Sequence, residues 1–291
     1  MLVSVLHGTN IAASWEYGSR LWCLDRRLAV RAGETLPIRF SEHLPVPVVR
    51  MCMNIQPDRD ALIIVDQQLD FEPGGALAVA GGDEIVEAIN SLAALFTEVV
   101  MTQDHHPRGH VSFASSYRDR ASFTRITLEE VEQGQVSLSE SAAFTLDELR
   151  AYLELAHGRE QALWPDHCVI GSAGEGFDPR LNVAHATLIL RKGYRPCADS
   201  YSAFRENDGI TTGLAECLMA KGIERVFVVG LAGDYCVFCT SMDAVEFGLE
   251  VVYLEDLTRF VGVPSGSRES AIARLRQGGV SIATGGGPIH V

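Results

Sequence analysis

Apolar residues recur along the chain from residue 60 in short runs that alternate with amphipathic stretches. Apolar runs rich in β-branched residues predict strands at 61–65, 98–102, 187–191, 225–230, 250–254 and 280–283. Apolar positions at helical spacing between most of these runs predict helices at 83–96, 211–221, 237–247 and 267–277. Because continuous apolar strands need cover on both faces, this alternation predicts an α/β domain with a doubly wound, mostly parallel six-stranded sheet and helices on both faces.

Two segments depart from this alternation. Residues 1–56 have no clear hydrophobic period, and we interpret them as an N-terminal extension that is either poorly packed or the product of a start codon assigned too far upstream. The alternative is a small accessory segment that packs on the body or on a neighbouring subunit. Residues 57–291 are predicted to form the enzyme domain. Within it, residues 118–161 are polar and acidic with one helical pattern at 146–155, which indicates an insertion or lid.

Charge and cysteine content narrow the class of protein. With 24 basic against 38 acidic side chains the formal net charge is −14 and there is no cluster of basic residues, which argues against nucleic acid as a partner. No stretch reaches the roughly 18 apolar residues of a membrane helix, and the first residues lack the pattern of a secretory signal, so we predict a cytoplasmic protein that binds no membrane. Seven scattered cysteines predict reduced thiols rather than a disulfide framework. Assembly into a homo-oligomer stays open.

Reactive residues follow four of the predicted strands. The first strand runs into Asp66, the second into Asp104 and His106, the third into Lys192, and the fourth into a glycine-containing turn before Cys236. Ligands of open parallel sheets bind beyond the carboxyl ends of the strands, so these side chains should meet at one edge. Lys192 is also one of only two lysines among the 24 basic residues, which makes its position unusual.

The residue set at this edge suits acyl transfer. Cys236 is predicted at a helix N-terminus, where the dipole should lower the pKa of its thiol and free backbone N–H groups can bind an oxyanion. A thiolate would attack a carbonyl, Asp66 would accept the thiol proton, and the Lys192 cation would favour both anions, giving a thioester. The alternative is that Cys236 is a small buried apolar residue, as we expect for the other six cysteines.

The sequence also argues against two other classes of protein. Cys236 and Cys239 form a C-x-x-C at a helix start, which is typical of disulfide oxidoreductases, but its place after the fourth strand of a large sheet argues against a thiol redox protein. No G-x-G-x-x-G follows the first strand, which argues against a dinucleotide-binding fold.

A set of oxygen and imidazole donors predicts one divalent metal ion. Asp104, His106 and His110 lie within seven residues, and His167 adds a further imidazole. Two or three histidines with one aspartate and an open position suit zinc first, with iron or manganese as alternatives. The competing interpretation is a His-rich turn without ligands.

A series of motifs carries a family resemblance over about residues 60–285. Together they resemble a nicotinamidase (pyrazinamidase) of the isochorismatase-like hydrolase superfamily. The motifs occupy residues 66–71, 73–79, 102–107, 109–113, 163–169, 191–193, 199–204 and 230–237. The resemblance implies the isochorismatase-like hydrolase fold and the conversion of nicotinamide to nicotinate and ammonia in NAD salvage, with pyrazinamide as a second substrate.

The resemblance also assigns roles to individual residues. It implies a catalytic triad of Asp66, Lys192 and Cys236, and an oxyanion hole formed by the N–H groups of Ala232 and Cys236. A cis peptide between Leu231 and Ala232 is implied as well. In this family the metal ligands match Asp104, His106 and His167, with His110 as a fourth ligand or a supporting group, and the pyridine nitrogen binds the metal. The aromatic residues that hold the ring match Phe71, Trp164 and Tyr201.

The chain departs from the family pattern at two places. Gly233 stands where Thr or Ser is expected, which could loosen the turn before the nucleophile, and the segment between Phe113 and Trp164 is longer than usual. The longer segment puts substrate choice in question. The alternative function is therefore a related hydrolase that acts on another small carboxamide or on an isochorismate-like ether.

Overall fold

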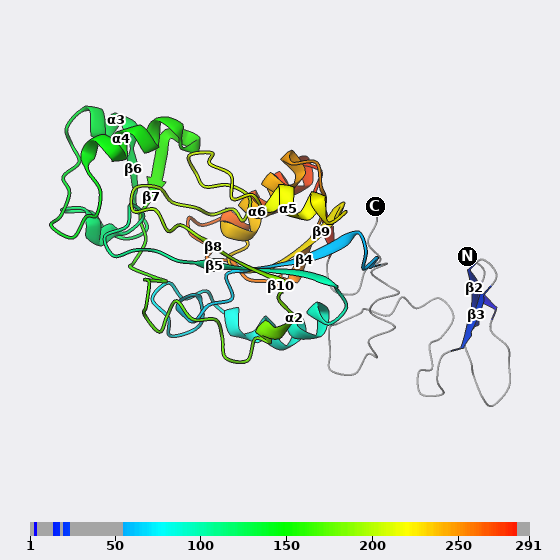
Figure 1. Cartoon of the computed structure of the whole chain (residues 1–291). Coiled ribbons are helices and arrows are strands. Elements are labelled where there is room, and N and C mark those ends of the chain that lie inside the picture. The colour runs from blue at the N-terminus through cyan, green and yellow to red at the C-terminus, as the bar shows by residue number, and fades with distance from the viewer. Residues whose placement is uncertain (1–2, 5–13, 18–19, 24–54, 284–291) are drawn as a thin grey trace. The chain divides into compact units, whose positions relative to one another are not determined.

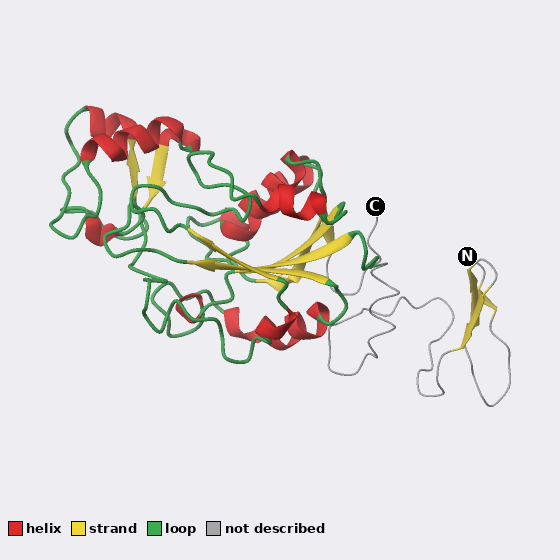
Figure 2. Cartoon of the chain, viewed as in Figure 1, coloured by secondary structure: helices red, strands yellow, loops and turns green. Residues whose placement is uncertain are grey.

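The computed structural model describes residues 3–4, 14–17, 20–23 and 55–283. Its main feature is a six-stranded sheet in the order β11-β10-β9-β4-β5-β8, in which every neighbouring pair is parallel (Figures 1 and 2). The strands are β4 (Asp60–Val65), β5 (Glu98–Asp104), β8 (Leu188–Lys192), β9 (Arg225–Gly230), β10 (Glu250–Thr258) and β11 (Ser281–Ala283). The predicted α/β fold and all six predicted strands are confirmed.

Helices cover both faces of this sheet, as predicted (Figure 2). One face carries α2 (Val86–Ala93) with the 3-10 turn η2 (Gly82–Ile85) before it. The other carries α5 (Leu214–Ala220), α6 (Cys236–Glu246) and α7 (Ser267–Gln277). The central strand β4 serves both cores, because Leu62 and Ile64 pack with α2 while Ala61, Ile63 and Val65 pack with the other three helices.

The predicted insertion folds around a small core of its own. It contains β6 (Arg125–Thr127), α3 (Leu128–Glu132), α4 (Leu146–Leu155) and β7 (Glu160–Ala162), and β6 pairs antiparallel with β7. Both helices begin with a capping box, Thr127 with Glu130 and Thr145 with Glu148, which satisfies backbone N–H groups of the first turn. Helix 146–155 is confirmed. The insertion lies beyond the carboxyl ends of the sheet strands (Figure 1).

Other elements are short. The remaining 3-10 turns are η1 (Leu69–Phe71), η3 (Ala114–Ser116), η4 (His157–Arg159) and η5 (Val183–His185). Within residues 1–39, which form a separate compact unit, β1 (Val3–Ser4), β2 (Ser14–Tyr17) and β3 (Arg20–Cys23) make an antiparallel sheet. The rest of the predicted extension 1–56 lies almost wholly outside the described residues. Across the described ranges, no helix is both long and apolar enough to span a membrane.

Candidate active site

The sheet order places the candidate residues at its switch point. The chain builds β4, β5 and β8 outward in one direction and then returns to the other side of β4 with β9. The crevice between β4 and β9 is where doubly wound sheets bind ligands. Asp66 follows β4 there, and Cys236 opens α6 after the turn that leaves β9. Asp104 and Lys192 end the two strands on the β5 side.

Lys192 is the group that joins these residues. Its side chain is fully buried, and Nζ lies 2.8 Å from Asp66 Oδ2 and 2.5 Å from Asp104 Oδ1. Nζ also donates to the Ser200 carbonyl at 3.1 Å and lies 3.5 Å from Cys236 Sγ. Burial opposes the charge, but the two carboxylates raise the pKa of Lys192 well above its usual value. The lysine is therefore a fixed cation between the thiol and both carboxylates.

Asp66 is held by two partners and keeps a raised pKa. The Thr102 hydroxyl donates a hydrogen bond to Asp66 Oδ1 at 2.6 Å and accepts one from the Asp66 backbone N–H. Asp66 Oδ2 is left to contact Lys192. Burial raises the pKa of Asp66, and the lowering effect of the Lys192 charge does not cancel this rise. For Asp104 burial acts in the same direction, but the charges of Lys192 and His106 outweigh it and hold the pKa well below its usual range. Of the two carboxylates, Asp66 is thus the one suited to accept and return a proton.

The prediction that the helix N-terminus lowers the pKa of Cys236 is wrong. Cys236 does open α6, but its side chain is buried, and burial raises the pKa of the thiol well above its usual value despite the Lys192 cation. The nearby Asp66 and Asp104 charges act in the same direction as burial. A resting thiol beside a carboxylate means that proton transfer has to accompany attack rather than precede it.

The turn between β9 and α6 presents backbone donors next to the thiol. The Leu231–Ala232 peptide is cis, as the resemblance implied, and the N–H groups of Tyr235 and Val237 both donate to the Ala232 carbonyl. Within the described part of the chain, the N–H groups of Ala232 and Cys236 donate to no backbone carbonyl outside the helices. Both groups are candidates to bind the oxyanion that forms on a carbonyl oxygen when the Cys236 sulfur attacks the carbonyl carbon.

Gly233 does not loosen this turn. A Cβ atom at Gly233 would lie 2.6 Å from both Phe260 and Tyr253 and 2.7 Å from Thr258, so packing from β10 and the following loop fills the space of a side chain. The Gly233 N–H also donates to the Arg259 carbonyl at 2.7 Å. Phe260, Tyr253 and Thr258 therefore occupy the space that a side chain at Gly233 would need.

Asp104, His106 and His167 form a buried group whose donor atoms all lie within 4.8 Å of one another. Each histidine uses Nδ1 against a backbone carbonyl at 2.8 Å, His106 on Gly193 and His167 on Pro165. Because a carbonyl only accepts, Nδ1 carries a proton in each ring, and Nε2 is the nitrogen that a metal ion could bind in the neutral form. The Nε2 atoms lie 3.4 Å and 3.8 Å from Asp104 Oδ2. This is the donor set and tautomer arrangement that fits a divalent metal ion.

His110 lies behind this group instead of within it. Its ring stacks on His106 with centroids 4.2 Å apart, its Nε2 faces the Ala198 carbonyl at 3.1 Å, and its Nδ1 lies 2.7 Å from Ser112 Oγ. Nε2 must therefore donate and Nδ1 accept, which leaves no lone pair for a metal. Burial and the neighbouring His106 hold the pKa of His110 well below its usual value. Of the two roles open to His110, the geometry favours the supporting one.

Aromatic side chains contact the candidate metal group and one another. The Phe71 ring lies 5.4 Å from His167, and Trp164 Nε1 donates to the Tyr201 hydroxyl at 3.2 Å. Tyr235 is not predicted from the sequence as a ring-site residue, although its ring lies 4.8 Å from Trp164 and it directly precedes Cys236. Phe123, half-exposed in the insertion, contacts Trp164 edge-on at 5.8 Å. The insertion thus contributes an aromatic ring to the predicted ring site.

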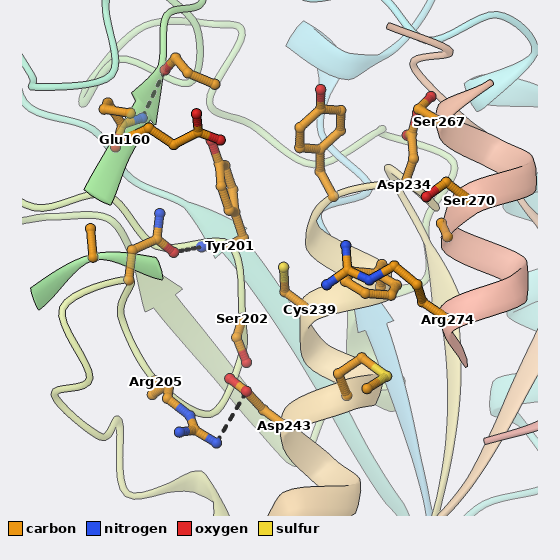
Figure 3. A pocket seen from close by; sticks show the side chains of 18 of the residues that line it. Glu160, Tyr201, Ser202, Arg205, Asp234, Cys239, Asp243, Ser267, Ser270 and Arg274 are labelled. Atoms are coloured by element: carbon orange, nitrogen blue, oxygen red, sulfur yellow. Dashed lines mark hydrogen bonds and ion pairs between the residues drawn. The ribbon is translucent and has the colours of Figure 1, made fainter. Parts of the chain in front are cut away.

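A second cavity, of about 700 Å³, is lined by Tyr201 and Tyr235 together with residues of α6 and α7 (Figure 3). Cys239 from α6 and Arg274 from α7 line it (Figure 3), whereas Cys236 is not among its lining residues and contacts Lys192. Both cysteines are free thiols, and burial raises the pKa of Cys239 to about 12. A thiol held so firmly in its protonated form is poorly suited to disulfide exchange.

Comparison with known proteins places this geometry in a family. Residues 60–285 match the model of the isochorismatase domain. The chain is 38% identical over 226 residues to a nicotinamidase of Acinetobacter baylyi, covering 77% of this chain and 92% of the relative. It is 33% identical over 229 residues to a nicotinamidase of Escherichia coli, covering 77% and 94%.

Solved structures agree with the sequence relatives. A nicotinamidase/pyrazinamidase of Acinetobacter baumanii matches with a TM-score of 0.67 and 38% identity, covering 79% of this chain and 98% of that one. The PnC1 protein of L. infantum in complex with nicotinate has a TM-score of 0.60 and 36% identity, with coverage of 79% and 94%. A pyrazinamidase of Pyrococcus horikoshii in complex with zinc has a TM-score of 0.55 and 29% identity, with coverage of 78% and 99%. The chain therefore belongs to the isochorismatase domain family, in its nicotinamidase branch of hydrolases that act on the carbon–nitrogen bond of amides.

Proposed function

We propose that this protein hydrolyses nicotinamide to nicotinate and ammonia through a thioester on Cys236. The observation that carries the proposal is the position of Lys192 Nζ, within 3.5 Å of the thiol sulfur and within 2.8 Å of both carboxylates. One fixed cation next to a nucleophile and a proton acceptor is what covalent amide hydrolysis requires. The nicotinate bound to the L. infantum relative supports the substrate class.

The chemistry begins at the thiol. Asp66, whose carboxylate helps to raise the pKa of the Cys236 thiol, accepts the thiol proton as the sulfur attacks the amide carbon. The resulting oxyanion accepts hydrogen bonds from the N–H groups of Ala232 and Cys236. Asp66 then returns the proton to the amide nitrogen, the carbon–nitrogen bond breaks, and ammonia leaves. Asp66 next takes a proton from water, which attacks the thioester carbonyl and releases nicotinate and the thiol.

Asp104, His106 and His167 would hold one divalent metal ion. Their inward-facing Nε2 atoms and carboxylate suit zinc, and the zinc-bound relative from P. horikoshii supports that choice over iron or manganese. When bound, the ion would supply a Lewis acid to the ring nitrogen of the substrate. Gly193 contributes to this site because a Cβ there would lie 2.4 Å from the His106 ring, and only a glycine leaves His106 its place.

Phe71, Trp164 and Tyr201 would hold the pyridine ring, with Tyr235 beside them. The Phe71 ring lies against His167, Trp164 contacts Tyr235, and the hydrogen bond from Trp164 to Tyr201 fixes the two relative to each other. Planar aromatic walls favour a planar heteroaromatic carboxamide, so pyrazinamide is included in the proposal. A role in NAD salvage follows from the product.

The domain bounds, the location and the partners of this protein are inferred from the sequence. We propose that residues 57–291 are the hydrolase domain, that 118–161 are an insertion over its ring site, and that 1–56 are an extension without a catalytic role. A cytoplasmic location and the absence of nucleic-acid and membrane partners stay predictions, and so does assembly into a homo-oligomer.

The direct test is ammonia release from nicotinamide by the purified, metal-loaded protein. Release with nicotinate as the co-product supports the proposal. No release from nicotinamide, with release from another small carboxamide, would replace it with the alternative function and would point to Phe123 and its segment as the cause of the different choice.

A further inference from the structure

A series of buried hydrogen bonds runs from the insertion to the segment that carries Tyr201. The Tyr152 hydroxyl on α4 donates to Gln161 Oε1 at 2.5 Å, and Gln161 Nε2 donates to Asp199 Oδ2 at 2.8 Å. These three side chains are buried, with exposed fractions of 4% for Tyr152, 1% for Gln161 and 2% for Asp199. Because a buried polar group is costly to leave without its partner, the series fixes its members relative to one another.

The Gln161 amide is bonded at both ends. Its Nε2 atom also lies 2.7 Å from the Ala162 carbonyl, which can only accept, so this atom is the amide nitrogen and Oε1 is left to face Tyr152. Burial raises the pKa of Tyr152 well above its usual value, so the hydroxyl keeps the proton that it donates to Oε1. Gln161 therefore joins the core of the insertion to Asp199.

Asp199 passes this restraint to the residues that follow it. Its Oδ1 accepts from the Ser200 N–H at 2.8 Å, and its carbonyl accepts from the Asn207 N–H at 2.9 Å. Asn207 Oδ1 in turn accepts from the Tyr201 N–H at 3.3 Å. The Ser200 carbonyl accepts from Lys192 Nζ at 3.1 Å. A restraint on Asp199 therefore reaches both the buried cation and a wall of the proposed ring site.

We propose that Gln161 is a positioning residue, which anchors Asp199 so that Tyr201 stands where the substrate ring binds. The inference rests on the proposed function, because the bound molecule is the planar carboxamide. Gln161 belongs to the insertion, so the segment that is longer than the family pattern supports the ring site from within the fold. The effect falls mainly on substrate binding, since Lys192 keeps its two carboxylate contacts when the Ser200 carbonyl shifts.

The kinetic test is Gln161→Met, which keeps the length of the side chain and removes its donor and acceptor. We expect KM for nicotinamide to rise about tenfold, the scale of losing a hydrogen bond to a charged group, with kcat close to that of the wild type. KM does not depend on how much of the protein is folded, so a loss of stability alone leaves it unchanged. An unchanged KM would overturn the proposal even if the Tm falls.

The matched control is Gln133→Met. Gln133 follows α3 in the same insertion, is exposed and bonds only on the surface to Glu129, so its variant should have the KM of the wild type.

A double-mutant cycle tests whether Gln161 acts through Tyr201. Gln161→Met should raise KM strongly in the wild type but much less in Tyr201→Ala, where the ring that Gln161 positions is already gone. Equal increases in the two backgrounds would show that the two residues act independently and would overturn the proposal.

Hydrogen exchange tests the anchor without turnover. The N–H groups of Ser200, Tyr201 and Asn207 should exchange faster in Gln161→Met, whereas those of α6 should not change. Unchanged exchange across 200–207 would contradict the anchor even in an active enzyme. Faster exchange there in a protein that does not hydrolyse nicotinamide would contradict the proposed function and support the anchor.

Discussion

Lys192 donates a hydrogen bond to Asp104 across 2.5 Å, so the ammonium group beside the candidate nucleophile also holds a candidate metal ligand. The same nitrogen contacts Asp66 at 2.8 Å. The two halves of the site, thiol chemistry and metal binding, therefore share one buried cation. A change at this residue should affect both, whereas a change in either half alone should leave the other largely intact.

Replacing Lys192 with arginine should lower kcat/KM by about 10²-fold or more, on the scale of losing one fixed electrostatic group from an active site. The ammonium has three donors aimed at a carboxylate on each side and at the Ser200 carbonyl, and the planar guanidinium cannot match them in a fully buried space. Steady-state kinetics measures the loss. Lys221→Arg is the matched control, because Lys221 is partly exposed and pairs with Glu98 at the start of β5, at the end of that strand opposite Asp104, so its activity should be unchanged.

Cys236→Ala should abolish hydrolysis while metal content and Tm stay close to those of the wild type, because the thiol is the only group that forms the thioester. Cys239→Ala provides the comparison three residues further along α6, and it should remain active because Cys239 faces the second cavity. Mass spectrometry of the wild type quenched during turnover should find an acyl adduct on residue 236. Turnover by Cys236→Ala would rule out the covalent route.

His167→Ala should reduce metal affinity more than His110→Ala does. Changes to groups that only support a metal ligand cost about 10–100-fold in affinity, so removing a ligand should cost at least that much. His110 contacts the ring of His106 and uses both of its own nitrogens in other hydrogen bonds. The loss of metal affinity in His110→Ala should therefore lie at the lower end of that range. Metal content after dialysis against a buffered metal series separates the two. Equal losses would make His110 a ligand.

Gly233→Thr, which installs a residue type that the family pattern expects, should destabilise this protein. The added Cβ alone would lie within 2.7 Å of Phe260, Tyr253 and Thr258, and overpacking of this kind costs about 1–3 kcal/mol. Gly233→Ala should show a smaller loss of the same sign in the free energy of unfolding. A variant as stable as the wild type would mean that these three side chains move aside readily.

Much of the fold and of the candidate site follows from the sequence. Strand ends in a parallel sheet converge, so Asp66, Asp104, Lys192 and Cys236 could be placed together from hydrophobic runs alone. The helix predicted at 211–221 begins later, at Leu214, because Gly213 has a left-handed backbone with a φ of 84°. The antiparallel pair of β6 and β7 could not be predicted, since strands of only three residues show no usable hydrophobic alternation in the sequence.

What the sequence could not supply depends on contacts between distant segments. The pKa of Cys236 was predicted from the helix dipole, but burial by the surrounding chain has the larger effect. Tyr235 and Phe123 reach the ring site through tertiary packing on Trp164.

Ammonia release from nicotinamide, measured before chelation, after chelation and after metal is restored, tests the central claim most directly. The account predicts release that disappears with the chelator and returns with zinc, in a protein whose Cys236→Ala variant binds the same amount of metal and releases none. Release that persists at full rate in the metal-free protein, or that survives the loss of Cys236, would contradict it.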